Sequence, residues 1–280
     1  MSVRSARAAE LGVALAVPAA RQRGFVERHR SRIRALASVI AVFVLWELVG
    51  RFVVTNRLFF VPLSSVFEAG GSLWARGQLQ VHLWTSSLEF VIGFSAAAIT
   101  GIALGAAMAV RRPLRDYLDP WVAFLYATPT VALAPLFILW FKLGIESKVA
   151  VIWLVAIFPI LLNTLTGIEG TDPDLIEAAR SFGARPLQIF RKVMLPSALP
   201  FIVTGVRLGL ARGLVGVVVA EFFGSKAGLG YLILFAAGTF DMATLFVGVL
   251  ILALAGVIGT EALKAVELRI APWRSLRAAR

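Results

Sequence analysis

The chain has 280 residues, of which 59% are apolar and 16% are charged, and its formal net charge is +12. A soluble domain of this length does not carry so much apolar sequence, so the composition predicts an all-α membrane protein. There is no cysteine, and His29 and His82 are the only histidines, which excludes a disulfide framework and argues against a metal centre.

Residues 1–34 form a basic tail ahead of the first long apolar stretch. Within it, residues 11–20 (LGVALAVPAA) resemble a weak signal peptide, because they are apolar and end in small residues. The apolar run is short, however, and an arginine-rich segment follows it from Arg21 to Arg34. These features favour a cytoplasmic tail, and a cleaved signal peptide is the alternative.

Six apolar stretches are each about 20 residues or longer, enough to cross a hydrocarbon core of about 30 Å at about 1.5 Å per residue. Polar Ser86 and Glu89 make the start of the second stretch indistinct, and Pro129, Pro135 and Pro159 predict kinks in the third and fourth. We therefore expect about six transmembrane helices in a domain over residues 35–275, before a C-terminal tail of 276–280. The six stretches cover residues 35–54, 85–110, 118–141, 149–168, 198–222 and 243–263.

The distribution of basic residues predicts the orientation of these spans. If the first tail lies inside, then segments 111–117, 169–197 and 264–280 lie inside as well. The four inside segments hold 20 of the 28 Lys and Arg residues, and the outside segments hold six. Because basic loops stay in the cytoplasm, we expect both termini there. The same asymmetry explains the positive net charge without nucleic acid as a partner.

Residues 169–197 break the apolar pattern and predict a helix–turn–helix in the cytoplasm. Asp172 is a natural N-cap, and Pro173 suits the first helical position, where its missing N–H has no partner to lose. Gly183 suits the left-handed residue that ends a helix. Apolar residues at helical spacing give the first helix one apolar side; they are Leu175, Ile176, Ala179 and Phe182.

Two further prolines delimit the second helix of this loop. Pro186 suits its first turn, and we expect Pro196 to stop it. The loop is thus too short to span the membrane. A surface helix that only covers the helix ends of its own chain is the alternative to a docking role.

A glycine stripe marks the fifth span. Gly205, Gly209 and Gly213 repeat every four residues, and with Gly216 they lie within about 80° of one another on a helix. Such a stripe lets the backbone of a second helix approach closely. A tight packing face is the first interpretation, and a sliding face used in alternating access is the second.

The fifth span also carries charges, which are costly in a membrane unless they face protein or water. Arg207 and Glu221 share the side opposite the glycines, so one hypothesis places both along a translocation path. A structural ion pair or snorkelling is the alternative for Arg207, and simple hydration near the outer end is the alternative for Glu221. We expect Arg212 to pair with a carboxylate on a neighbouring helix.

Residues 177–196 carry a spaced motif, EAARSFGARPLQIFRKVMLP. It resembles the cytoplasmic coupling loop of ABC-importer permeases, the membrane subunits of solute importers driven by ATP hydrolysis on a separate protein. The resemblance implies that the first short helix sits in a groove on the ATPase, where the two alanines permit close approach. It also implies that the glycine turns the chain back to the membrane. The residues in register are Glu177, Ala178, Ala179, Gly183, Val193, Leu195 and Pro196.

The resemblance continues from about Leu45 to Trp273 and is similar to the nitrate, sulfonate and taurine subfamily of these permeases. It implies the type I (MetI-like) fold, two ATPase subunits, a second permease copy forming a homodimer, a periplasmic or lipid-anchored binding protein, and a multi-pass location in the lipid of the bacterial inner membrane. The segments that carry it are PLFILWFKLGIESKV (135–149), FPILLNT (158–164), LPFIVTGVRLGLARG (199–213), VVAEFFGSKAGLGYLI (218–233) and PW (272–273).

The sequence offers no nucleotide site of its own. It contains no Gly-Lys dipeptide and hence no phosphate-binding loop of the G-x-x-x-x-G-K-[ST] type. We therefore expect a subunit that is not an enzyme and holds no cofactor, with ATP and Mg²⁺ bound by the partner ATPase.

The leading hypothesis is an ABC-importer permease for a small, anionic solute of the sulfonate, taurine or nitrate class. A permease of the same type for an uncharged or vitamin-precursor solute is the alternative. An ion-driven secondary transporter would show inverted repeats, and none is evident. An intramembrane enzyme would need a catalytic set deep in the spans, where there is no histidine or aspartate.

Overall fold

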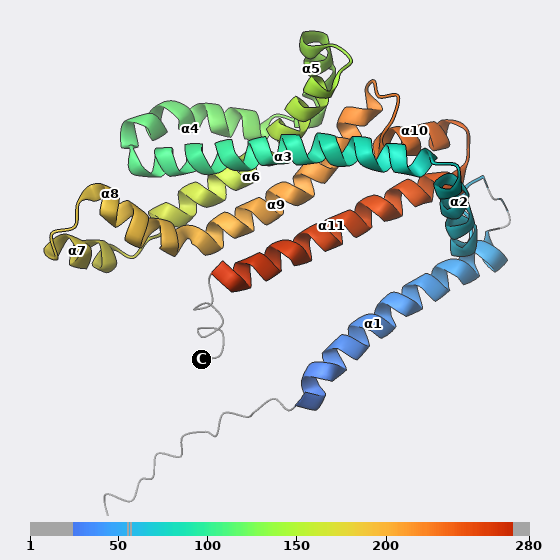
Figure 1. The fold of residues 1–280 in the computed structure, drawn as a ribbon, viewed down its shortest axis with the longest axis horizontal. Helices are drawn as coiled ribbons and strands as arrows, with labels where there is room; N and C mark the ends of the chain where they lie inside the picture. Colours follow the sequence, from blue (N-terminus) through green and yellow to red (C-terminus); the bar gives the residue numbers. More distant parts are fainter. Residues whose placement is uncertain (1–24, 55, 57, 271–280) are drawn as a thin grey trace, which may run out of the picture.

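The computed structural model describes residues 25–54, 56 and 58–270, and this part of the chain contains helices and no strand (Figure 1). The cytoplasmic-tail hypothesis for residues 1–24 and the tail at 276–280 lie outside it. The helices in chain order are α1 (Phe25–Leu48), the π-helix η1 (Val49–Val53), α2 (Leu63–Ala75), α3 (Gln78–Val110), α4 (Arg112–Ala127), the 3₁₀-helix η2 (Thr130–Leu133), α5 (Ala134–Phe141), α6 (Ile145–Glu169), α7 (Pro173–Ser181), α8 (Pro186–Ile189), the π-helix η3 (Phe190–Met194), α9 (Leu195–Phe222), α10 (Leu229–Gly238) and α11 (Met242–Ile270).

Five of the described helices are long and apolar enough to cross a membrane, or six if one bent pair counts as a single span. The bent pair is α4 with η2–α5, whose axes differ by 90°. A continuous helix over residues 118–141 is therefore not what the chain forms. Thr128 is extended because a proline follows it, so α4 ends there and Pro129 turns the chain.

The centre of the bundle is α6, which packs most extensively against α9 and α3. Glycines on both neighbours bring the backbones close. A Cβ at Gly205 would lie 2.8 Å from Cβ of Asn163, and one at Gly209 would lie 2.7 Å from Cδ1 of Ile160. Gly213 is buried in the same stripe, so the stripe serves as the α9 packing face against α6.

A second apolar cluster lies toward the α2 end of the bundle. It joins α2, α10 and the start of α11 with the first turn of α3, through buried Val66, Leu73, Leu229, Leu232 and Val247 among others. Neither α2 nor α10 is among the six stretches expected from sequence, because α2 has 13 residues and α10 has 10, too few to span a membrane.

The first span lies apart from the other long helices, as Figure 1 shows. Among its described side chains, the contacts with the other helices lie near its end, where Trp46 donates from Nε1 to the carbonyl of Val61 at 3.0 Å and its ring meets Phe246 edge-on at 5.0 Å. Between residues 33 and 43 of α1 the side chains are exposed in this chain. The helix begins at Phe25, so residues 25–34 of the expected tail are helical.

Candidate functional site: the coupling helices and the polar contacts of the bundle

The helix α7 forms where the sequence predicts it. The Asp172 side chain accepts a hydrogen bond from the N–H of Asp174 at 3.0 Å, and Pro173 occupies the first turn. At the other end Gly183 has φ of +74°, and its N–H donates to the carbonyl of Arg180 at 2.8 Å. The left-handed turn expected at Gly183 is thus confirmed.

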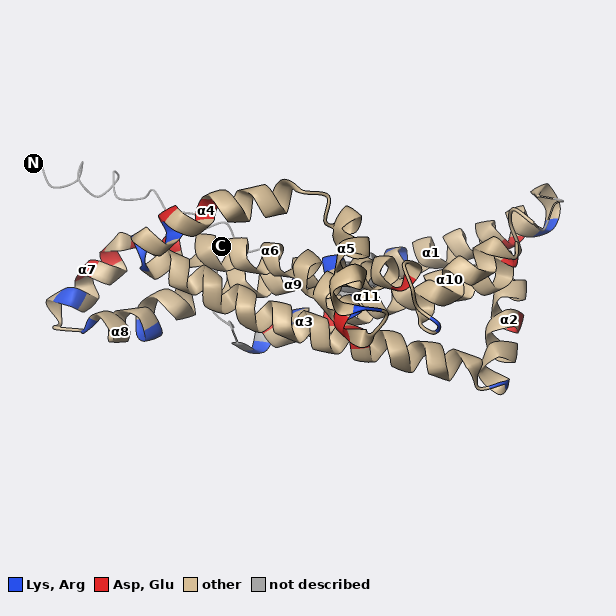
Figure 2. Cartoon of the chain, turned by 90° about the horizontal axis from the view of Figure 1, so that it is seen from above, with Lys and Arg blue, Asp and Glu red and all other residues tan. Residues whose placement is uncertain are grey.

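Helices α7 and α8 project from one end of the molecule, and charged residues gather along them while the long helices are mostly uncharged (Figure 2). Two apolar side chains point outward here: Leu175 of α7, which is 52% exposed, and its C-cap residue Phe182, which is 92% exposed. Glu177 and Ala178 are exposed, and Ala179 is half-buried. An apolar, small-residue surface is therefore available to a partner.

A hollow of about 810 Å³ separates α7 from the C-terminal end of α6. Its lining is mostly polar and includes Glu169, Thr171, Glu177 and Arg180. Arg115 of α4 forms an ion pair with Glu169, so α4 and α6 are tied together beside the first turn of α7.

The second half of the loop differs from the sequence-based expectation. Pro186 does start α8, but Pro196 does not stop it, because the helix continues through η3 into α9. The π-helical turn η3 lies just before Pro196. Because proline has no backbone N–H, the i to i−4 hydrogen-bond pattern of an α-helix is interrupted there. Leu195 and Pro196 are half-buried. The coupling loop and the fifth span thus form one connected helical element.

Arg207 contacts α11 in this chain. Its Nη2 lies 2.6 Å from Oε2 of Glu267, and neither side chain is fully exposed. The sequence left a translocation-path role and a structural ion pair or snorkelling open for Arg207, and the structure contains an ion pair. Arg212 is exposed, and among the described residues no carboxylate lies within ion-pair distance of it, so the expected partner is absent there.

Glu221 is buried against protein, whereas one expectation placed it at a solvent-accessible end of the helix and another on an open face. It is 1% exposed and accepts hydrogen bonds from Ser86 of α3 and from two backbone amides of α10. The expectation of an open position was wrong because the start of α10 folds back over the C-terminal end of α9, which periodicity along α9 alone does not reveal.

A second buried ionic contact lies close by and was missed from sequence. Nζ of Lys148 on α6 lies 2.9 Å from Oε1 of Glu89 on α3 and 2.8 Å from Oγ of Ser225. Glu89 is 2% exposed, and its Oε2 has no hydrogen-bond partner. The available signal was the presence of Glu89 and Lys148 within or beside apolar stretches, since such charges need partners.

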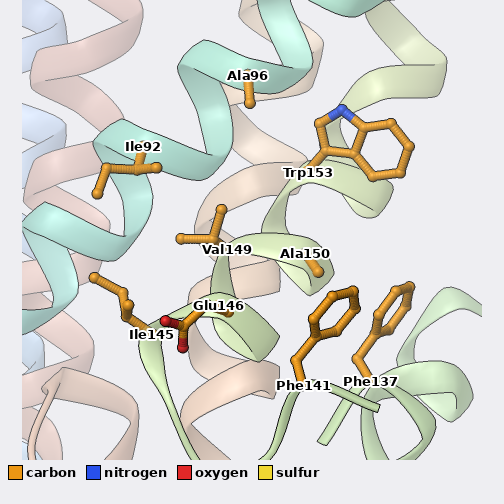
Figure 3. A pocket seen from close by; sticks show the side chains of 9 residues that line it. All are labelled: Ile92, Ala96, Phe137, Phe141, Ile145, Glu146, Val149, Ala150 and Trp153. Atoms are coloured by element: carbon orange, nitrogen blue, oxygen red, sulfur yellow. The ribbon is translucent and has the colours of Figure 1, made fainter.

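An apolar cavity of about 420 Å³ lies between α3, α5 and α6 (Figure 3). Aromatic Phe137, Phe141 and Trp153 point into it with aliphatic neighbours, and Glu146 is the only ionisable side chain that lines it. A cavity of this kind offers no donor to an anion and a carboxylate that repels one. It is therefore a poor binding site for a small anionic solute.

Comparison with known proteins decides the family. Residues 97–272 match the family described as the binding-protein-dependent transport system inner membrane component. The chain belongs to this family. It is a multi-pass integral membrane protein and a permease subunit of an ABC importer, of the sulfonate and taurine type.

Three relatives illustrate the range of this permease family. The aliphatic sulfonates transport permease protein SsuC of Bacillus subtilis is 32% identical over 87% of this chain and 88% of its own. The taurine transport system permease protein TauC of Escherichia coli is 30% identical over 85% of this chain and 89% of its own. The riboflavin transport system permease protein RibX of Chloroflexus aurantiacus is 39% identical over 69% and 73%.

The permease fold is confirmed by a solved structure. A chain of the methionine ABC transporter MetNI, in inward-facing conformations, superposes with a TM-score of 0.59 at 19% identity. The match covers 69% of this chain and 96% of the other. The fold class is therefore the type I, MetI-like ABC-importer permease.

Proposed function

We propose that this permease forms the membrane pathway for a small organic anion of the sulfonate or taurine class, handed over by a binding protein at the outer side. The observation that carries the proposal is the pair of exposed helices α7 and α8, whose spaced motif and outward Phe182 suit a docking partner. The solute class rests on the sulfonate and taurine relatives.

The driving force comes from a partner ATPase that binds ATP and Mg²⁺, while this chain performs no covalent chemistry. Glu177, Ala178, Ala179 and Gly183 belong to the docking surface, and the continuous helix through Leu195 and Pro196 carries movement from α8 into α9. ATP-driven closure of two ATPase copies would then rock the spans between inward-open and outward-open states.

A second copy of this chain completes the pathway as a homodimer, because one copy leaves large apolar surfaces on α1, α4 and α5 to be covered by lipid and protein. The excess of basic residues in segments 111–117 and 169–197 supports a bacterial inner-membrane location with both termini in the cytoplasm. Arg207 and Glu221 act on the pathway through the contacts they make rather than as free charges in an open pore.

The riboflavin relative supports an uncharged solute as the second candidate. Uptake by the complete transporter in proteoliposomes separates the two: labelled taurine or an alkylsulfonate accumulates with ATP, and labelled riboflavin does not. Accumulation of riboflavin alone would refute the anion class while leaving the permease function intact.

A charge reversal tests the docking surface. Glu177→Arg should abolish ATP-dependent uptake and binding-protein-stimulated ATP hydrolysis, although the variant inserts into the membrane. Glu68→Arg is the matched control, because Glu68 is an exposed carboxylate on α2, away from the coupling helices. Normal coupling in the Glu177 variant would reject α7 as the docking helix.

A further inference from the structure

The first turn of α10 is held by a side chain from another helix. Oε2 of Glu221, on α9, accepts hydrogen bonds from the N–H of Gly230 at 2.5 Å and of Tyr231 at 3.3 Å. A helix N-terminus leaves its first N–H groups without intrahelical partners. At α10 a carboxylate from α9 supplies them, whereas the N-cap residue Gly228 has no side chain to do so.

Helix α3 supplies the remaining acceptors. Oγ of Ser86 accepts from the N–H of Leu229 at 2.7 Å and donates to Oε1 of Glu221 at 2.6 Å. Nδ1 of His82 accepts from the N–H of Gly228 at 3.0 Å. Four consecutive amides at the start of this short helix, those of residues 228–231, are thus bound by three side chains from two other helices, α3 and α9.

A second polar contact holds the loop that leads into α10. Oγ of Ser225 accepts from Nζ of Lys148 and donates to the carbonyl of Ala227 at 2.5 Å, and the lysine is bound to Glu89. We call these contacts of Glu221, Ser86, His82 and Lys148 with residues 225–231 the latch.

The latch joins two bodies, each centred on its own apolar cluster, and the second cluster also takes in Leu79 from the first turn of α3. One body is α3, α6 and α9, around buried residues such as Ile157 and Ile160. The other is α2, α10 and α11, around buried residues such as Leu232 and Val247. Near the start of α10 the hydrogen bonds of the latch add to the apolar packing of Leu229 between the bodies, and hydrogen bonds change partners in discrete steps while packed cores resist deformation.

The chain at the latch is built for close contact and a sharp turn. Gly228 has φ of +121°, and a Cβ there would collide with the Glu221 carboxylate. A Cβ at Gly230 would lie 2.9 Å from the carbonyl oxygen of Val218. These close approaches hold only while α10 stays against α9, so a displacement of α10 would separate its first amides from the Glu221 carboxylate.

We propose that Glu221 is the positioning residue of this latch, and that transport requires the latch to open and close as the α2–α10–α11 body moves against the α3–α6–α9 body. The inference rests on the proposed function for its link to transport. The latch itself is a property of the chain and is tested separately below.

The test variant is Glu221→Gln. A glutamine has a single acceptor oxygen, so when that oxygen binds the two α10 amides the Ser86 hydroxyl loses its acceptor, and a neutral oxygen binds the amides more weakly than a carboxylate does. Glu47→Gln is the matched control, because Glu47 accepts from the N–H and the hydroxyl of Ser64 at the start of α2, both at 3.0 Å, and lies outside the latch. Ser86→Ala is a milder second variant, should the glutamine assemble poorly.

The reporter is a cysteine at Lys226, which is exposed and precedes α10 in a chain without native cysteine. In the complete transporter we expect its labelling rate to differ at least threefold between the nucleotide-free state and an ATP-bound state blocked in hydrolysis. Glu221→Gln should remove the difference and label at the faster rate in both states, with Ser86→Ala intermediate. Glu47→Gln should keep the difference.

The outcomes separate the two proposals. Equal labelling in both states of a transporting wild type, or a wild-type pattern in Glu221→Gln, would overturn the latch, and so would the same loss in Glu47→Gln. If the wild-type chain binds no ATPase, the proposed function fails instead. The latch is then judged in the isolated chain by hydrogen exchange of amides 229–231, which Glu221→Gln should speed at least tenfold; an unchanged rate would overturn it.

Discussion

The two ends of the bundle hold their short helices in different ways. At the coupling end, α7 is capped by Asp172, which is adjacent in sequence, and closed by Gly183, and its surface is exposed. At the other end, α10 is capped by Glu221 and by Ser86, which lies 143 residues from the amide it binds, and the contact is buried. One helix is held by local contacts and open to a partner, while the other depends on the packing of the whole bundle.

The difference has a physical cause. A helix at an aqueous surface can satisfy its orphan amides with water, so a local cap suffices and the outer face stays free. A helix inside a bundle in lipid has no water to draw on, so its amides need protein acceptors. These acceptors lie on α3 and α9, so they fix the position of α10 relative to both helices. The same hydrogen bonds therefore connect the α2–α10–α11 body to the α3–α6–α9 body.

The largest expected effect breaks the buried ion pair beside the latch. Lys148→Met leaves the Glu89 carboxylate buried without its cation, a change that typically costs about 3 to 5 kcal/mol. The midpoint of thermal unfolding in detergent should fall by several degrees or the protein should fail to accumulate.

The double variant Lys148→Met with Glu89→Gln is the control for this pair. It removes both charges, so most of the lost thermal stability should return. If Lys148→Met alone is as stable as the wild type, the pair does not exist in the membrane-embedded protein.

The coupling end responds to a backbone change rather than to a buried charge. Gly183→Val puts a β-branched residue at φ of +74°, a strain of about 1 to 3 kcal/mol that the exposed loop relieves by changing its turn. Docking should then fail, with ATP-dependent uptake lowered about tenfold or more in proteoliposomes. Ala184→Val, at the next residue, should transport nearly normally; equal loss in both variants would show that the turn is not the cause.

The contrast also explains how far sequence reasoning reached. Local signals predicted the apolar helices, the N-cap at Asp172 and the left-handed turn at Gly183. The structure has each of these features at the expected residues. The burial of Glu221 and the pairing of Lys148 with Glu89 could not be read from one helix at a time. They depend on α10 folding back, and α10 is too short and too uniformly apolar to reveal that path.

The bend at Pro129 and the continuous helix at Pro196 teach a related lesson. Proline marks both places in the sequence, yet the chain turns by 90° at one and continues at the other. A π-turn before Pro196 accommodates the missing donor, and packing on α6 holds the helix together there. Propensity predicts an irregularity, and tertiary contacts decide its form.

The ion pair of Arg207 and Glu267 joins α9 to α11. It is therefore a second polar contact between the two bodies that the latch connects. Both side chains are partly accessible, so its removal should cost only about 1 kcal/mol of stability. If the pair is a structural joint, Arg207→Gln and Glu267→Gln should slow uptake similarly, by about twofold to fivefold. The double variant should then be no slower than either one.

A path role for Arg207 predicts a different pattern in the same uptake assay. Removing the arginine would slow anion uptake, while Glu267→Gln would leave it unchanged or raise it by freeing the positive charge. Equal uptake of the anion by the wild type and Arg207→Gln would exclude the arginine from the path altogether.

The smallest expected effect tests which end faces which side of the membrane. Ser181→Cys at the coupling helix and Lys226→Cys near α10 both replace exposed side chains in a chain without cysteine, so neither should alter stability or uptake measurably. In intact cells an impermeant thiol reagent should label the cysteine at 226 and spare the one at 181, and in inside-out vesicles the pattern should reverse. Labelling at 181 in intact cells would place the coupling helices outside, where no ATPase could reach them, and would overturn both the orientation and the docking role.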